Sequence, residues 1–343
     1  MRAYGRRKVL ALAAGVLAAA TACTSSAAPP STKPAAASST PSPSASAVAV
    51  TRAEAAKVFT EITLGDNVLR ADGLRGESSL EGRLKLEVEG LTTGGRTPLT
   101  QAAFLSTGYA PPRYRWGTPT LYVPRFPPGE QAPWFSALAT RDGRPALLTF
   151  AKSDLWRLSS VAQLLPDQQV PEIQVDSEGY ATALAPDDKT VTISPQFMQP
   201  VHASVAETGS AGVTAGLLAP GPYTTEVAEQ IADLRKEAKL SGYSYDSIFS
   251  ADSFPVYALR TADGGALIQY SLSRTTTTTT RTAEDDPLPV PDSARWAISD
   301  PVLRRTLRLV ETHQYATAVP PLAKPSAAAV IAHDGGLTRA SGT

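Results

Sequence analysis

The first pattern along the chain predicts an amphipathic helix over residues 51–71. Apolar side chains recur there at the three- and four-residue spacing of one helix face. Thr51 is followed three residues later by Glu54, which is the capping-box pattern, so we expect the helix to begin at Thr51. We expect Gly65 to break the helix, because glycine is a poor helix former. A second helical segment, at residues 78–91, can form a hairpin with it.

Alternating apolar and polar residues then predict a region rich in strands. Four strands are expected, at residues 120–125, 134–140, 146–152 and 155–163. The turn at residues 141–144, Arg-Asp-Gly-Arg, joins the middle two strands in a hairpin, because Asp-Gly favours tight hairpin turns. Beyond these strands we expect a further strand at residues 174–184 and a helix at residues 194–207.

The same order of elements begins again after residue 222. Thr224 or Thr225 can cap an amphipathic helix there. The elements expected after this helix are two strands, a helix and a hairpin, at residues 256–261, 266–272, 300–310 and 327–341. Pro301 stands at the first position of the later helix, where proline is well tolerated, and residues 334–336, Asp-Gly-Gly, supply the turn of the last hairpin.

An internal similarity supports two related domains. Residues 135–150 and 256–270 both contain Ala-Leu-x-Thr-x-Asp-Gly followed by Ala-Leu. Coincidence is the alternative, because hairpins often use Asp-Gly turns. We expect a first domain at residues 51–208, a second at residues 223–341, and a linker bearing glycine and proline at residues 209–222.

The order of elements in each predicted domain resembles a known fold. A helix followed by a curved antiparallel sheet with a Trp-bearing strand, here Leu155-Trp156-Arg157-Leu158, is similar to the cone-shaped α+β fold shared by nuclear transport factor and ketosteroid isomerase. The expected fold class is therefore α+β, with two tandem domains in which a helix or helix pair packs on a curved, mostly antiparallel sheet. A similarity of fold implies no activity.

The first 22 residues have the organisation of a lipoprotein signal peptide. Basic residues, at positions 2, 6, 7 and 8, precede a run of 14 small and apolar residues, Val9 to Ala22. This run is too short to span a membrane, which takes about 20 residues, and is typical of a signal peptide. Ala20, Thr21, Ala22 and Cys23 resemble the lipobox of bacterial lipoproteins, which implies that the Cys23 thiol is lipidated and the chain cut just before it. The alternative is an ordinary cleavable signal with a leftover thiol.

The residues after the lipobox predict a tether. Residues 24–50 contain 24 Ala, Ser, Thr or Pro among 27 residues, too little apolar surface to offset the entropy of ordering. Residues 23–50 are therefore a lipidated cysteine with a disordered tether, and the expected location is the extracytoplasmic face of the cell membrane. Arg6-Arg7 leaves twin-arginine export open beside general secretion.

Composition excludes several classes of function. The chain has 32 Lys plus Arg and 32 Asp plus Glu, and removing residues 1–22 takes away four basic residues, which leaves 28 against 32. A mature chain of net charge about minus four has no electrostatic footprint for nucleic acid. One cysteine and three histidines exclude a disulfide framework and a cysteine-rich metal site.

Motifs for chemistry are mostly absent. The sequence has no Gly-x-Ser-x-Gly, Ser-x-x-Lys, His-Glu-x-x-His, phosphate loop or Gly-x-Gly-x-x-Gly, so no catalytic residue, cofactor site or metal site is assigned. Asp66 and Asp72 are weak candidates for a general base at the mouth of a cone pocket, with solvation at a helix end as the favoured interpretation. The histidines, His202, His313 and His333, lie far apart in sequence and are expected to be surface or satisfied core residues, with convergence on a metal or base role as the alternative.

Three further features each have a structural and a functional interpretation. Asp285-Asp286 is expected to be solvated loop charge, with a cation site as the alternative. Residues 275–280, six threonines, are expected to form an extended strand, with a ligand-facing or O-glycosylated row of hydroxyls as the alternative. Residues 109–126 carry five aromatic residues interleaved with arginines; we expect a packed loop, and a carbohydrate- or peptide-contact loop is the alternative.

The chain as a whole resembles uncharacterised actinobacterial lipoproteins. The resemblance is carried by the Trp-Phe-x-Ala-Leu strand at residues 134–138 and above all by the segment Pro255 to Leu267, and it covers about residues 51–340. It implies a lipid anchor and the domain layout, and no activity.

The expected function is therefore a membrane-anchored binding or interaction module without catalytic activity. Its partners are the membrane, through the lipid on Cys23, and an envelope protein or a cell-wall ligand. The alternative is a small-molecule carrier, or an isomerase or lyase, that uses the pocket of a cone fold. A third possibility is a structural or assembly factor for secreted enzymes.

Overall fold

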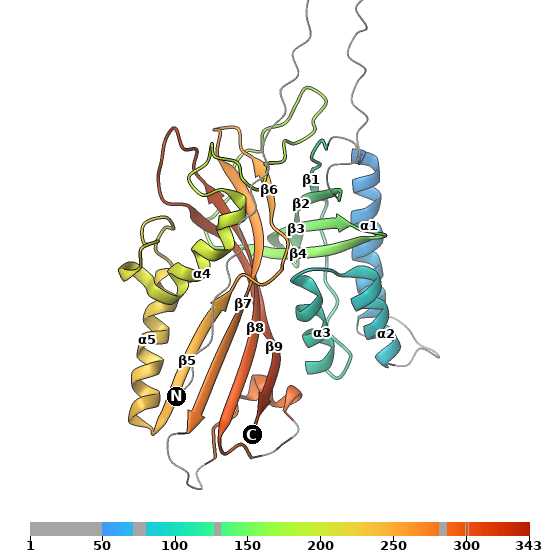
Figure 1. Cartoon of the computed structure of the whole chain (residues 1–343). Coiled ribbons are helices and arrows are strands. Elements are labelled where there is room, and N and C mark those ends of the chain that lie inside the picture. Colours follow the sequence, from blue (N-terminus) through green and yellow to red (C-terminus); the bar gives the residue numbers. More distant parts are fainter. Residues whose placement is uncertain (1–49, 71–79, 127–131, 281–286, 299, 301) are drawn as a thin grey trace, which may run out of the picture. The chain divides into compact units, whose positions relative to one another are not determined.

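The chain folds around one nine-stranded sheet. The computed structural model describes residues 50–70, 80–126, 132–280, 287–298, 300 and 302–343. The strand order is β1-β2-β3-β4-β9-β8-β7-β5, with β6 beside β7, and every pair is antiparallel (Figure 1). The strands are β1 (Thr120–Tyr122), β2 (Trp134–Arg141), β3 (Arg144–Lys152), β4 (Trp156–Leu164), β5 (Tyr243–Ser250), β6 (Tyr257–Arg260), β7 (Ala266–Thr280), β8 (Thr306–Val319) and β9 (Ala329–Gly342). The expected α+β class is confirmed.

Helices accompany two groups of strands. The helices are α1 (Arg52–Leu69), α2 (Leu80–Leu86), α3 (Arg96–Ser106), α4 (Met198–Thr208) and α5 (Thr225–Leu240), with short turns η1 (Glu87–Leu91), η2 (Pro195–Phe197), η3 (Gly209–Ala211) and η4 (Asp292–Ala297). We call α1–α3 with β1–β4 the first half, and α4 and α5 with β5–β9 the second half (Figure 1). The sheet is continuous between the halves because Gln163 and Leu164 of β4 pair with His333 and Ala332 of β9.

Alternation along the strands distributes the apolar side chains into three large cores, besides a small cluster of Leu288, Leu303 and Leu307. Successive residues of a strand point to opposite faces, so Leu148 packs with α1 while Leu147 packs toward the second half. In β7, Ile268 packs with α4 and α5 while Leu267 packs toward the first half. Each half thus has an outer core under its own helices, and the halves share an inner core.

The cap of α1 is confirmed and the predicted break is wrong. The Thr51 hydroxyl accepts a hydrogen bond from the Glu54 backbone N–H at 3.1 Å. The helix continues through Gly65 to Leu69. A Cβ at Gly65 would lie 3.2 Å from the side chain of Leu91, so the glycine permits close packing of η1 on the helix rather than ending it.

Several other predicted elements are confirmed. The turn at residues 141–144 forms a β2–β3 hairpin in which Asp142 and Gly143 have positive φ, as the Asp-Gly turn requires. Residues 275–280 continue β7 as an extended strand. The predicted helices near residues 194–207 and after Thr224 correspond to α4 and α5, although α4 packs on α5, β5 and β7 of the second half.

Three predictions near the C-terminus and in the middle of the chain are wrong. Residues 306–319 form the strand β8 where a helix was expected, because they pair with β7 on one side and β9 on the other. Residues 329–342 form one strand, β9, where a hairpin was expected. Residues 174–184 hold only isolated bridges, and β5 had no predicted counterpart.

The Asp-Gly-Gly segment does not turn, because it pairs with β8, and Gly335 makes room for this pairing. It lies within β9 directly opposite His313 of β8. A Cβ at Gly335 would stand 2.6 Å from His313 Nδ1 and 3.0 Å from the Thr312 carbonyl oxygen. The glycine is therefore needed for the close approach of an imidazole, which is a common role of glycine inside a strand.

Candidate functional site

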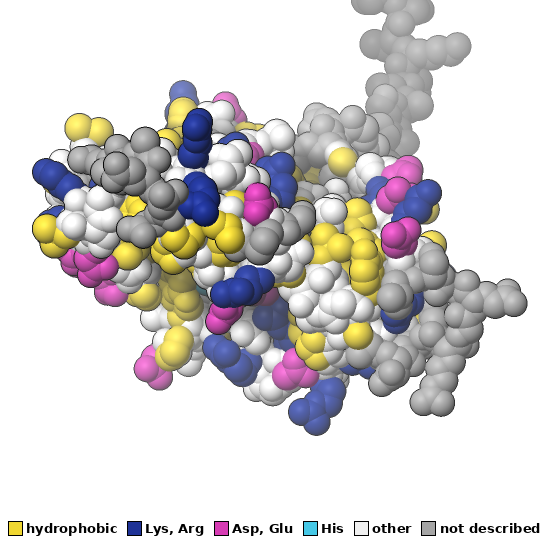
Figure 2. All heavy atoms as spheres, turned by 90° about the horizontal axis from the view of Figure 1, so that it is seen from below, with side chains coloured by type: hydrophobic (Ala, Val, Ile, Leu, Met, Phe, Trp, Pro, Cys, Tyr) yellow, Lys and Arg dark blue, Asp and Glu magenta, His cyan; other side chains and the backbone are white. Residues whose placement is uncertain are grey.

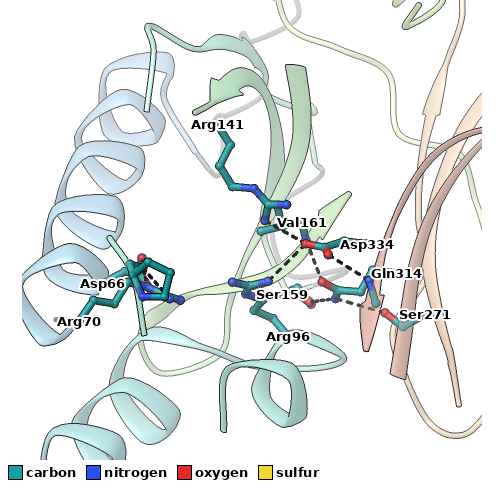
Figure 3. A network of polar contacts seen from close by, with 11 residues as sticks. Asp66, Arg70, Arg96, Arg141, Ser159, Val161, Ser271, Gln314 and Asp334 are labelled. Carbon is teal, nitrogen blue, oxygen red and sulfur yellow. Dashed lines mark hydrogen bonds and ion pairs between the residues drawn. The ribbon is translucent and has the colours of Figure 1, made fainter. Parts of the chain in front are cut away.

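Helix α3 lies along β9 and joins the two halves on one side of the sheet. It contacts β9, β4 and η4. Near its N-terminus, the buried guanidinium of Arg96 lies 3.8 Å from Asp334 Oδ2, and Arg141 Nη1 of β2 donates to the same oxygen at 2.9 Å (Figure 3). The carboxylate of Asp334 on β9 therefore holds both α3 and β2, through ion pairs that burial protects from screening by salt.

Two glutamines complete this junction. Gln314 Oε1 of β8 accepts from the Val161 backbone N–H at 3.0 Å, and its Nε2 donates to the Ser159 carbonyl at 3.1 Å (Figure 3). Gln269 of β7 makes hydrogen bonds of 2.6 and 2.8 Å with the hydroxyls of Ser136 and Thr149. Both amides are buried. Gln314 therefore satisfies backbone groups of β4 that have no strand partner in the second half, while Gln269 links β7 to hydroxyls of β2 and β3.

A second buried cluster lies between α1, η1 and α3. Arg70 Nε donates to both carboxylate oxygens of Asp66 at 2.8 Å, and the guanidinium carbon lies 4.3 Å from the ring centroid of Tyr114 (Figure 3). Burial, followed by the charge of Asp66, raises the pKa of Glu87 to about 9. Arg70 Nη2, Glu87 Oε2 and Arg96 Nε have no hydrogen-bond partner among the described residues. This interior is tightly packed and lines none of the cavities described for the chain.

The junction leaves a cleft where α3 and the sheet separate. The cleft has a volume of about 610 Å³. It is lined by Gln101, Leu105, Tyr109, Trp296, Ala297, Arg308, Val310, Thr338, Arg339, Ala340 and Ser341. These residues come from α3 and the turn after it, from η4, and from the paired ends of β8 and β9. Two aromatic rings, two guanidinium groups and several hydroxyl or amide groups therefore share one concave surface, as in small-molecule sites.

Strand register places the charged residues of the cleft on its floor. Arg308 pairs with Ser341, and Val310 pairs with Arg339, so these four side chains share one face of the sheet. Arg308 and Arg339 are exposed, and their side chains form no ion pair or hydrogen bond with any described residue. Figure 2 views the end of the molecule where these strand ends lie, and Lys and Arg side chains stand beside hydrophobic side chains there.

The backbone at Tyr109 is held in an uncommon conformation. Tyr109 has φ of 66° and follows Gly108, which also has positive φ. This left-handed region is costly for a bulky residue. The Tyr109 N–H donates to the Phe104 carbonyl at 2.6 Å, and the buried Arg83 donates to the Tyr109 carbonyl at 3.2 Å. These two bonds keep the residue in place at the wall of the cleft.

The three histidines lie together inside the second half. Ring centroids of His202 and His333 lie 4.4 and 5.1 Å from that of Tyr315, and His313 Nδ1 lies 3.0 Å from His333 Nε2. His202 Nε2 lies 2.7 Å from the Tyr223 carbonyl oxygen, so this nitrogen donates, and Nδ1 accepts from the Tyr270 hydroxyl at 2.8 Å. Burial lowers the pKa of His202 to about 4 and that of His333 to about 3. These two imidazoles are therefore neutral parts of an aromatic core.

The structure locates some of the residues singled out in the sequence. Asp66 is buried and paired with Arg70. Asp72, Asp285, Asp286, Cys23 and the lipobox residues Ala20, Thr21 and Ala22 lie outside the described residues.

The described part of the chain holds neither a cluster suited to a metal ion nor a helix suited to a membrane. Within residues 50–343, less the gaps given above, no cluster of three or more histidine, cysteine or acidic side chains is arranged to hold a metal ion. Among the same residues, no helix has the length and apolar content needed to cross a membrane.

Most of the cleft had no signal in the sequence. Tyr109 belongs to the aromatic segment for which a contact loop was the alternative to the expected packed loop, and that is the one local hint. Trp296, Arg308 and Arg339 belong to elements far apart in the chain, and the sequence pattern predicted a helix around residue 308. Only the β8–β9 register and the position of α3 bring these residues together.

Comparison with known proteins places the chain among uncharacterised proteins. An uncharacterised lipoprotein of Streptomyces coelicolor is 29% identical to it over 330 residues, which cover 90% of this chain and 88% of that protein. No solved structure matches the chain. The resemblance to uncharacterised actinobacterial lipoproteins is confirmed. Residues 46–342, most of the chain, match the family described as "Domain of unknown function (DUF8094)", and the protein belongs to that family.

Proposed function

We propose that this protein is a lipid-anchored receptor of the cell envelope, which binds a ligand in the cleft between α3 and the ends of β8 and β9. The protein does not turn its ligand over. The Streptomyces relative is named a lipoprotein, and Cys23 follows a lipobox-like sequence in this chain. Lipid on Cys23 holds the chain on the extracytoplasmic face.

The cleft is the observation that carries the binding role. A cavity of about 610 Å³ is large enough for a drug-sized molecule or a short oligomer. Its wall includes Tyr109, held in a left-handed conformation by two hydrogen bonds, and its floor includes two arginines without partners. The strained backbone at Tyr109 is a cost that a ligand-binding surface explains.

No described geometry favours the alternative of an isomerase or lyase. That alternative depended on Asp66 or Asp72 at a pocket mouth. Asp66 accepts two hydrogen bonds from Arg70 and is absent from the lining of the described cavities.

A division into two α+β units is also part of the proposal, and the separate outer core in each half supports it. Leu184, Met198 and Leu218 pack in the core of the second half, so the boundary lies before residue 184 and not at the expected domain ends, 51–208 and 223–341 with a linker at 209–222. The likeness to the cone-shaped fold rests on the order of elements in the sequence, since no solved structure matches the chain. Thermal unfolding followed by calorimetry tests the division, since independent domains would unfold in two transitions.

The binding role is tested by photo-cross-linking in living cells with the full-length, lipidated protein. A photoreactive amino acid replaces Gln101 in the cleft, and in a control replaces Leu240, which is 89% exposed on α5 and does not line the cleft. We expect an envelope component to be captured at position 101 and not at 240. Equal capture at both positions, or none at 101, would contradict the proposal.

The anchor is tested separately by Cys23→Ala. We expect the variant to leave the membrane fraction and to lose acyl labelling, because a single tether carries the membrane attachment. A membrane-bound, unlabelled Cys23→Ala protein would show that attachment does not depend on this residue.

A further inference from the structure

The charge of the cleft indicates which ligands it can hold. None of the residues that line it is acidic, while Arg308 and Arg339 contribute two positive charges. These charges stand in a chain whose mature form has an excess of four acidic residues. Two guanidinium groups without an anionic partner, facing the same cavity, repel each other until an anion lies between them.

We infer that the ligand is an anionic carbohydrate, a glycan that bears carboxylate or phosphate groups. This inference rests on the proposed binding function and names its ligand class. Diagonal neighbours across two strands have Cβ atoms about 7–8 Å apart, so the long side chains of Arg308 and Arg339 can meet at one anionic group. Arginine binds carboxylate and phosphate through paired N–H donors, which gives the contact direction as well as strength.

The remaining walls suit a sugar ring. Tyr109 and Trp296 present flat apolar faces with polar edges, and both are half-buried. Gln101, Thr338 and Ser341 add amide and hydroxyl groups that can donate and accept hydrogen bonds. A sugar has the same mixture, because its C–H groups form an apolar face and its hydroxyls form a polar rim.

The floor of the cleft continues into the row of threonines on β7. Thr277 pairs with Arg308, and Thr275 pairs with Val310, so these threonines share the face of the cleft floor. Thr279 follows on the same face, and all three are half-exposed. A surface that extends from the arginines along a row of hydroxyls fits a chain of sugars better than a single small anion.

Calorimetric titration of the full-length, lipidated protein in neutral detergent tests the inference. The probes are an oligomer of galacturonic acid, glucose 6-phosphate, a neutral glucose oligomer of matched length, and inorganic phosphate, all at one ionic strength. We expect at least one of the two anionic sugars to bind, and to bind at least tenfold more tightly than the neutral oligomer and than inorganic phosphate. The first two probes separate carboxylate from phosphate as the recognised group.

Variants assign the binding to the cleft. Arg308→Gln and Arg339→Gln are each expected to weaken the anionic sugar at least tenfold, and Trp296→Ala to weaken it while the fold is kept. Arg295→Gln is the matched control, because Arg295 is exposed on η4, pairs with Asp292 and does not line the cleft. The control removes one positive charge nearby and is expected to change affinity less than twofold. Circular dichroism confirms that each variant is folded.

The outcomes separate this inference from the proposed function. Tight binding of the neutral oligomer, equal loss in Arg295→Gln, or no loss in the arginine variants would overturn the anionic class. Capture at Gln101 of a partner that carries no anionic sugar would overturn the class and leave the binding function standing. Absence of both sugar binding and capture at Gln101 would overturn the two together.

Discussion

The two halves of this protein bury polar side chains of opposite kinds. Under the helices of the first half lie ionisable groups, with the Asp66–Arg70 pair and Glu87 at the centre. Under α4 in the second half lie neutral rings, with His202 and Tyr315 in contact. The first interior depends on paired charge and the second on stacked rings and hydroxyl bonds, so the two are expected to respond oppositely to pH.

The elements of each half explain the difference. In the first half, a helix places Asp66 and Arg70 one turn apart, which is the spacing at which side chains on a helix meet. In the second half, strand register places Tyr270 opposite Tyr315, and Tyr315 opposite His333, so their rings lie over one another across three strands. Helix spacing thus assembles an ion pair, whereas sheet register assembles a stack.

The largest expected effect comes from breaking the charged interior. Arg70→Met keeps an apolar side chain of similar length but leaves Asp66 buried without its partner, and we expect a loss of about 3–5 kcal/mol in the free energy of unfolding. Tyr270→Phe is the counterpart in the second half. It removes one hydroxyl that bonds His202 and Thr317, and we expect a loss of about 1–2 kcal/mol. Denaturant unfolding of both variants measures the contrast, and equal losses would contradict it.

The next effect concerns how the first half responds to rising pH. The pKa of Glu87 is about 9 in the folded protein against 4.5 as its ordinary value. Unfolding at neutral pH therefore releases a proton, so the stability that Glu87 contributes is complete below pH 4.5 and is lost as pH rises toward 9. Between pH 5 and 8 the free energy of unfolding is expected to fall by about 4 kcal/mol because of Glu87.

Glu87→Gln tests that response, because glutamine is close in shape to a protonated glutamate and cannot ionise. Against the wild type, we expect the variant to gain stability steadily from pH 5 to pH 8 and to show little difference near pH 4. Denaturant unfolding at each pH measures the difference. A constant offset between the two proteins over this range would mean that Glu87 does not keep its proton in the folded state.

The second half is expected to respond in the opposite direction. The pKa of His202 is lowered from 6.5 to about 4 by burial. Below pH 6.5 His202 binds a proton in the unfolded chain but not in the folded chain. The free energy of unfolding therefore falls by about 3 kcal/mol for this residue as pH falls from 6.5 to 4. His333 adds a loss of the same sign, because its pKa is also lowered.

His202→Gln tests this acid response. Glutamine can still donate to the Tyr223 carbonyl and cannot be protonated. We expect a modest loss of stability at pH 7 and a loss on acidification that is about 3 kcal/mol smaller than in the wild type. NMR titration of the wild-type imidazole gives a direct check, since a His202 that titrates near 6.5 in the folded protein would exclude this origin of acid sensitivity.

Sequence alone was informative where neighbouring residues carry the signal. The cap at Thr51, the hairpin at residues 141–144 and the threonine strand at 275–280 each follow from a few adjacent side chains. The helix predicted at residues 300–310 was wrong because Leu307 and Val310 fit a helix face and also fit a strand. Pairing with β7 and β9 decided between the two, and that pairing depends on distant residues.

The two interiors and the cleft were mostly beyond reach of local patterns. The histidines converge because α4 places His202 against Tyr315 of β8, beside His313 and His333, and no spacing in the sequence reveals this. The cleft takes its floor from β8 and β9 and its walls from α3 and η4. Asp66 and Arg70 are one helical turn apart, so their pairing could have been foreseen, whereas the burial that makes it important could not.

The smallest effects are expected at the junction where the two halves meet. Gln314→Leu leaves the Val161 N–H and the Ser159 carbonyl without partners, and neither can find another inside a packed core. We expect a loss of about 2 kcal/mol in the free energy of unfolding, since unsatisfied buried backbone groups carry the full cost of desolvation.

Gln269→Leu is the matched change on the neighbouring strand and is expected to cost less, about 1 kcal/mol. Its partners are the hydroxyls of Ser136 and Thr149, which lie 3.4 Å apart and can bond each other once the amide is gone. Denaturant unfolding measures both losses. A smaller loss in Gln314→Leu than in Gln269→Leu would mean that hydrogen bonds to hydroxyls, and not to main-chain groups, hold the halves together. A cost at Gln314 equal to that of Arg70→Met would instead move the main polar anchor of the fold from the charged interior to the junction.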